Sequence, residues 1–190
     1  MQTFATSVRL LERARENEED AWESIVRIYR PFIGRILTLS GMWEPDREDL
    51  LQEVMTTLVR EVPNFRHSGR PGAFRSWLRS VVRNRILGYQ RYHAVRSHLP
   101  LDSEVFHVSA TNELWEHFDR QHDLHVMHEL LQLIQSEFTN STWTAFQMQM
   151  LEGCRASDVA TALGMSTSAV LSAKSRVLRR LRCEATGLIE

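Results

Sequence analysis

The sequence predicts an all-α protein built from two small helical domains joined by a linker. Apolar residues recur with the 3.6-residue period of an α-helix in most segments between residues 7 and 182. No segment alternates polar and apolar residues as a half-buried strand would. Between about residues 94 and 120 the helical period fades, and Pro, Ser, Asp and Asn become common, so we expect a linker that is partly helical around Leu114–Phe118. We therefore expect domains at 1–96 and 123–190 and an acidic linker at 97–122.

Composition favours a folded cytoplasmic protein. The chain has 190 residues, of which 43% are hydrophobic, enough for one large domain or two small ones. The two cysteines, Cys154 and Cys183, form no CxxC motif, which favours a reducing compartment. No N-terminal apolar run resembles a signal peptide, and no apolar stretch is long enough to span a bilayer.

The formal net charge of −1 hides a segregated distribution of charges. Residues 64–101 contain eight arginines and no acid, whereas residues 102–137 contain eight acids and one arginine, Arg120. Blocks of opposite charge indicate different partners for the two regions.

Four helices are expected in the first domain, at residues 7–17, 20–41, 45–63 and 73–92. Pro31 lies inside the second and should kink or break it, because proline removes a backbone donor. Asp46 is the expected N-cap of the third helix, and Asp49 lies on its first turn, where the helix dipole favours acids.

The arginine-rich stretch begins with the loop NFRHSGRPG at residues 64–72. Arg75, Arg79 and Arg83 then fall four apart on one face of the following helix. Arginines interleaved with aromatic side chains suit single-stranded nucleic acid, and Phe65 and Tyr92 are the aromatics least needed in the core. This cationic face has no acidic residue nearby in the sequence, so we expect an anionic partner for it.

The second domain should hold helices at 125–138 and 142–152 and a helix-turn-helix at 155–182. Gly164 is placed to end the first helix of this motif in a left-handed conformation, and Ser166 to cap the second. The apolar face of the second helix comprises Val170, Val177, Leu178 and Leu181. Its other face carries serines and arginines, which suit contact with DNA. This pattern alone fits an ordinary helical hairpin with a solvated basic face equally well.

Enzymatic signatures are missing. The sequence has no glycine-rich phosphate loop, no GxSxG elbow and no HExxH helix. His122, His125 and His128 fall at intervals of three, but the outer two point about 120° apart around a helix axis and no cysteine lies nearby. We expect a solvated or linker-facing histidine cluster, no metal and no other cofactor.

Three strings in the first domain are distinctive: DREDLLQEV at 46–54, NFR at 64–66 and AFRSWLRSVVRNRI at 73–86. Together they resemble region 2 of the bacterial RNA polymerase sigma factors of the sigma-70 family, and residues 10–33 fit the start of that region. The helix-turn-helix is similar to region 4. A chain with only these two regions and a short linker resembles the extracytoplasmic-function (ECF) class. The resemblance implies a non-enzymatic subunit that binds core polymerase, directs it to the −10 and −35 elements of specific promoters and promotes promoter opening.

The resemblance also implies roles for three groups of residues. Binding to the β′ clamp helices of core polymerase is implied for Asp49, Leu50, Gln52, Glu53 and Val54. Contact with the −10 element, including bases flipped out of the stack, is implied for Phe65, Arg66, His67, Arg70, Arg75, Arg79, Arg83, Asn84 and Arg91. Contact with the −35 element in the major groove is implied for Ser166, Thr167, Ser168, Ser172, Ser175, Arg176 and Arg179.

Further partners follow from the same resemblance. The polymerase β flap is a second docking point, the acidic linker would run toward the RNA channel, and an anti-sigma protein is a regulator that such chains can have. We expect a monomer in the free state. The chain departs from the family at 170–173, where VLSA stands in place of a VKSR-like string and two usual basic positions are apolar.

Two other functions remain open from the sequence. A stand-alone helix-turn-helix regulator that binds operator DNA as a dimer would explain the C-terminal part. It leaves the DREDLLQEV helix and the basic first domain without a role. An RNA-binding or metal-dependent enzyme that uses the histidine cluster is the third possibility.

Overall fold

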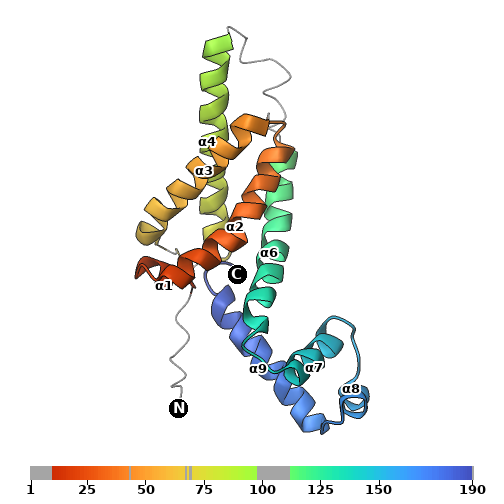
Figure 1. Ribbon diagram of the computed structural model, residues 1–190. Helices are drawn as coiled ribbons and strands as arrows, with labels where there is room; N and C mark the ends of the chain where they lie inside the picture. The colour runs from red at the N-terminus through yellow and green to blue at the C-terminus, as the bar shows by residue number, and fades with distance from the viewer. Residues whose placement is uncertain (1–9, 43, 67, 69, 98–111, 190) are drawn as a thin grey trace.

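The structure, a computed structural model, describes residues 10–42, 44–66, 68, 70–97 and 112–189. Within these ranges every regular element is helical, which confirms the all-α prediction. The elements are α1 (Leu10–Arg15), α2 (Glu19–Leu39), α3 (Glu44–Glu61), the 3-10 helix η1 (Val62–Asn64), α4 (Ala73–Ser97), α6 (Asn112–Gln135), α7 (Asn140–Met150), α8 (Ala156–Leu163) and α9 (Thr167–Ala185) (Figure 1). No helix in the described part of the chain is long and apolar enough to cross a membrane.

Helix α2 lies at the centre of the N-terminal part and packs against α1, α3 and α6. Its apolar residues recur with the helical period, and Ile25, Ile28 and Ile33 are completely buried. The helix continues through Pro31, so the expected break does not occur. Pro31 lies on the exposed face, where water can hydrogen-bond the carbonyl group that loses its donor.

Helix α3 begins two residues before the expected cap. It starts at Glu44, and Asp46 lies within its first turn. The Asp46 carboxylate instead accepts a hydrogen bond from the Tyr89 hydroxyl of α4. Partial burial raises the pKa of Tyr89 well above its ordinary value, and this hydrogen bond raises it further. Asp46 therefore joins two helices, and the prediction that it caps α3 was wrong.

Helix α6 runs straight through the expected domain boundary between residues 122 and 123. Residues 112–122 are helical, and Leu114, Trp115 and Phe118 are buried in the same core as α2. The residue that completes this buried stripe is His122, which is polar and so hid the helical period in the sequence. Of the expected linker, 98–111 lies outside the described residues.

A continuous apolar core runs through both expected domains, from Leu10 on α1 to Leu188 after α9. A smaller cluster fills the helix-turn-helix, where Val159 of α8 meets Val170 and Ala173 of α9. The two predicted domains are therefore joined along α6, which packs against α2, α4 and α9.

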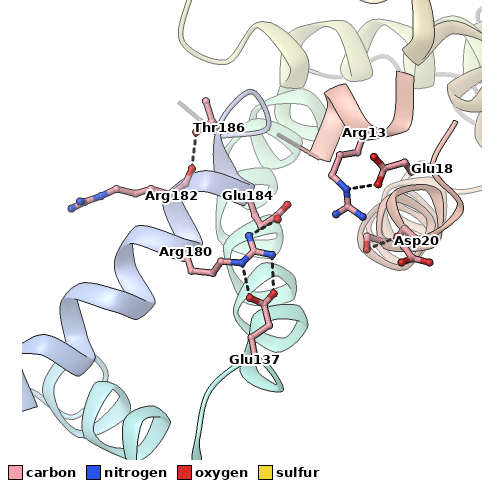
Figure 2. A network of polar contacts seen from close by, with 9 residues as sticks. Arg13, Glu18, Asp20, Glu137, Arg180, Arg182, Glu184 and Thr186 are labelled. Carbon is pink, nitrogen blue, oxygen red and sulfur yellow. Dashed lines mark hydrogen bonds and ion pairs between the residues drawn. The ribbon is translucent and has the colours of Figure 1, made fainter. Parts of the chain in front are cut away.

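A charged cluster fastens α9 to the end of α6 (Figure 2). Arg180 donates from Nε to Glu137 Oε2 at 2.6 Å and from Nη2 to Glu137 Oε1 at 2.8 Å. It also donates to Glu184, which is only 6% exposed. This bidentate arrangement holds α9 against the turn that follows α6.

The helix-turn-helix has the turn that the sequence predicted. Gly164 ends α8 with φ of +62°, a left-handed conformation that glycine adopts without steric cost. Ser166 Oγ accepts a hydrogen bond from the Ala169 backbone at 3.2 Å and caps α9. Figure 1 shows α7, α8 and the start of α9 at one end of the molecule, away from α3 and α4.

Candidate nucleic-acid interface

The arginine face of α4 is present, but it is not uncompensated as predicted. Arg75 Nη1 lies 2.6 Å from Asp123 Oδ2, and Arg75 Nε lies 3.8 Å from Asp119 Oδ1. Arg79 also pairs with Asp119. Both acids lie on α6, at least 40 residues further along the chain, so their sequence positions gave no sign of the pairing. Arg83, the third arginine of this face, is exposed.

The turn before α4 makes room for Arg75. Gly72 has a φ of +70°, and a Cβ atom at this position would lie 2.7 Å from Arg75 Nη2. The left-handed backbone favours glycine, and a larger side chain would also displace the end of the Arg75 side chain. The turn therefore positions the first arginine of the face.

The loop between η1 and α4 places its aromatic residue inward. Phe65 packs against Phe74 and Trp77, with ring centroids 5.4 Å and 5.1 Å away. Its backbone carbonyl accepts a hydrogen bond from Arg15. Phe65 is therefore half-buried against the apolar side of α4, and its stacking on bases stays a prediction. Arg66 and Arg70 are exposed, and His67 lies outside the described residues.

At the other end of α4, the residues predicted to contact DNA remain accessible. Asn84 and Arg91 are exposed, and Tyr92 is 59% exposed. Asn84 lines a groove of about 430 Å³ between α3 and α4, together with Asp49 and Glu53. Residues predicted to contact DNA and residues predicted to contact polymerase therefore share one groove.

Helix α3 divides the residues predicted to bind polymerase into two groups. Asp49, Gln52 and Glu53 are exposed. Leu50 and Val54 are only 4% and 0% exposed and belong to the apolar core. Direct contact by these two was a wrong prediction, because the helical period turns them toward α2 and α4.

Helix α9 presents an exposed face that carries four hydroxyl side chains, two arginines and one leucine. It comprises Thr167, Ser168, Leu171, Ser172, Ser175, Arg176 and Arg179. Ser166 is occupied in capping the helix, and Arg176 also donates to Thr142 Oγ1 at 3.3 Å. Of the two apolar departures noted in the sequence, Leu171 is 50% exposed, whereas Ala173 is completely buried. Only Leu171 therefore changes the surface.

Comparison with known proteins identifies the part of the chain formed by α2, α3 and α4. Residues 25–96 match the family model Sigma-70 region 2. The chain contains a sigma-70 region 2 domain. Sigma factors initiate transcription and are not enzymes, which agrees with the prediction of a non-enzymatic protein.

The other comparisons add no further relationship. A chain from the structure titled "1.8 A structure of RsbN-BldN complex" aligns over 90% of this chain and 96% of that chain, with 16% sequence identity and a TM-score of 0.34. No curated protein sequence matches the chain.

The histidines lie where α6 meets region 2. His122 is completely buried, with its ring 5.8 Å from Tyr29 and 5.6 Å from Phe32, and its Nδ1 lies 2.8 Å from Asp123 Oδ1. Burial lowers the pKa of His122. The prediction of a solvated cluster was therefore wrong for this residue. No group of three or more His, Cys, Asp or Glu side chains within the described ranges could hold a metal ion.

His125 makes a neutral bridge between α6 and α2. Its Nε2 donates to the Ile28 carbonyl at 2.6 Å, and Nδ1 accepts from Arg35 at 2.6 Å. Burial lowers the pKa of His125, and the nearby Arg35 cation lowers it further. The ring must be neutral to make both hydrogen bonds, so this contact with region 2 favours the deprotonated form.

Proposed function

We propose that this chain is an ECF-type sigma factor. It binds core RNA polymerase in the cytoplasm, directs it to promoters through the −10 and −35 elements and promotes opening of the DNA. The observation that carries the proposal is the order of parts along the chain: region 2 at residues 25–96, followed by a helix-turn-helix in α8 and α9.

The −35 element is assigned to α9. The N-terminal part of this helix exposes Thr167, Ser168 and Ser172, whose short side chains let a helix approach base edges closely. Arg179 lies further along the exposed face, where a guanidinium group can reach the phosphate backbone. These features support docking of α9 in the major groove.

The −10 element is assigned to α4 and the loop before it. Arg66 and Arg70 are exposed in the loop, and Arg83 and Asn84 are exposed in the middle of α4. Guanidinium groups suit the phosphates of a separated strand, and the amide can hydrogen-bond a base. In the region 2 family this strand is the non-template strand of the opened −10 element.

Core polymerase is assigned to α3, where Asp49, Gln52 and Glu53 are exposed. Through the family resemblance, these side chains dock on the β′ clamp helices, and the helix-turn-helix unit docks on the β flap. Leu50 and Val54 keep α3 in place from inside the core.

Reconstituted transcription tests the proposal. Purified protein is mixed with core polymerase and promoter fragments from its own genome, and run-off transcripts are measured beside a core-only control. We expect a stable complex with core and promoter-specific transcripts. Failure to bind core would overturn the proposal. A tight symmetric dimer in light scattering, with operator binding in the absence of polymerase, would favour the stand-alone regulator instead.

A further inference from the structure

Two carboxylates of α6 occupy two arginines of the proposed strand-binding face. Asp123 pairs with Arg75 at 2.6 Å, and Asp119 pairs with Arg79 and lies 3.8 Å from Arg75. The four side chains are between 27% and 39% exposed, so the pairs are partly withdrawn from water. Carboxylates and phosphates present the same paired oxygen acceptors to a guanidinium group. The α6 acids therefore satisfy these arginines as a DNA backbone would.

The rest of α6 is docked on the same region 2 surface. Phe118 packs edge-on against Phe32 of α2, with ring centroids 4.9 Å apart. His125 donates to the Ile28 carbonyl at 2.6 Å. The ion pairs therefore belong to an extensive contact that holds α6 over the arginines of α4.

Around this contact lie buried polar atoms that have no hydrogen-bond partner among the described residues. They are Tyr29 Oη on α2, and Trp115 Nε1 and His122 Nε2 on α6. An unpaired buried polar group costs free energy, and water would satisfy it if α6 moved away. The α6 contact is therefore weaker than its apolar content suggests, as expected of a surface that separates.

We infer that α6 is an internal competitor for the region 2 arginines: in the free protein Asp119 and Asp123 hold Arg75 and Arg79, and single-stranded −10 DNA binds these arginines only after α6 leaves. The inference rests on the proposed function, because it takes the α4 face as the site of the strand. Since Glu137, in the turn that directly follows α6, is bound to Arg180 of α9, release of α6 also moves the helix-turn-helix relative to region 2.

The test measures binding of a fluorescent single-stranded oligonucleotide to the full chain by anisotropy. The variant is Asp119→Asn/Asp123→Asn. Its matched control is Glu113→Gln/Glu116→Gln, which removes two exposed charges from the same helix. Glu116 pairs with Arg120 of α6 itself, so the control leaves the pairs with α4 intact. We expect the variant to bind at least about fivefold tighter than wild type, because a larger fraction of molecules is competent to bind. The control should change affinity by less than about twofold.

Two further readouts distinguish failure of the inference from failure of the proposed function. If Arg83→Glu loses binding while the aspartate variant behaves like its control, competition by α6 is disproved and the strand-binding face stands. If neither wild type nor any variant binds the oligonucleotide, and Arg83→Glu has no effect on promoter opening, the proposed −10 site itself is wrong.

Hydrogen–deuterium exchange of the wild-type protein follows the movement directly and needs no substitution. On addition of saturating oligonucleotide, amides in residues 112–126 should exchange faster, because α6 leaves region 2. Unchanged or slower exchange in this segment, at an oligonucleotide concentration that saturates the anisotropy signal, would overturn the inference.

Discussion

Arg75 of α4 and Asp123 of α6 form a direct ion pair, with 2.6 Å between Nη1 and Oδ2, although they lie 48 residues apart in the sequence. The pair joins the region 2 domain to the helix that leads into the helix-turn-helix. Together with the pairing of Arg79 with Asp119, it gives two of the region 2 arginines a partner inside the chain. Exposed and paired arginines on α4 should therefore respond differently to substitution.

Charge reversal at an exposed arginine of α4 should impair promoter opening without affecting assembly with polymerase. Arg83→Glu replaces a cation that can hold a phosphate with an anion that repels it. We expect at least about a tenfold loss of permanganate reactivity in the −10 region, with core binding unchanged. Arg27→Glu, which reverses an exposed charge on α2, is the matched control. Normal opening by the Arg83 variant would show that this face does not hold the strand.

Removal of the Arg180 side chain should destabilise the junction of α6 and α9. In Arg180→Met, Glu137 loses a bidentate partner and Glu184, which is 6% exposed, loses the cation that compensates its burial. We expect a loss of about 1–3 kcal/mol in the free energy of unfolding, measured by urea titration. The neighbouring Arg179→Met, at an exposed position, should change it by less than about 0.5 kcal/mol. Equal losses in the two variants would show that the charged cluster has no special part in stability.

The elements that sequence reasoning predicted well are those with local signals. The turn of the helix-turn-helix follows from Gly164 and Ser166, each of which acts on its own neighbouring backbone. Pro31 misled the prediction for α2, because its effect depends on whether it faces solvent. The extent of α6 was underestimated, because His122 interrupts the apolar stripe and its burial depends on aromatic rings from α2.

The candidate site was predictable as a set of residue types and not as a surface. The four-residue spacing of Arg75, Arg79 and Arg83 places them on one helix face, as the structure confirms. Their pairing with Asp119 and Asp123 depends on how two distant helices pack, and no local pattern encodes it. The inward orientation of Phe65 likewise depends on Phe74 and Trp77. Tertiary contacts therefore decide which of the predicted residues are accessible.

Acidification should weaken the fold through the buried histidines. Burial lowers the pKa of His122 and of His125 below the ordinary 6.5, so below that pH the unfolded chain binds more protons than the native chain. Stability is therefore fully present above about pH 6.5 and falls as the pH drops below it, with a slope of at most about 1.4 kcal/mol per pH unit for each group.

The charges around His122 set the sign of this effect. Burial is the largest cause and lowers the pKa of His122, and Arg75 and His125 lower it further, so that together they outweigh Asp123, which favours the protonated ring. Urea midpoints measured between pH 7.5 and 5.5 should fall less steeply for His122→Phe than for wild type. His117→Gln, a half-exposed position on the same helix, should retain the wild-type slope. An unchanged slope in His122→Phe would exclude His122 as a source of the pH dependence.

The two apolar departures on α9 should give opposite results when each is replaced by a basic residue. Leu171 is 50% exposed on the face assigned to the −35 element, so Leu171→Lys adds a cation where it can reach DNA. We expect tighter binding to duplex DNA of any sequence and a slope of log affinity against log salt that is steeper by about 0.9. Ala173 is completely buried between α8 and α9, so Ala173→Lys should unfold the helix-turn-helix by forcing a charge into its small core. Salt-dependent anisotropy with duplex DNA and circular dichroism melting of both variants make the comparison. If Leu171→Lys leaves the salt dependence unchanged while the protein stays folded, this face of α9 does not lie against DNA.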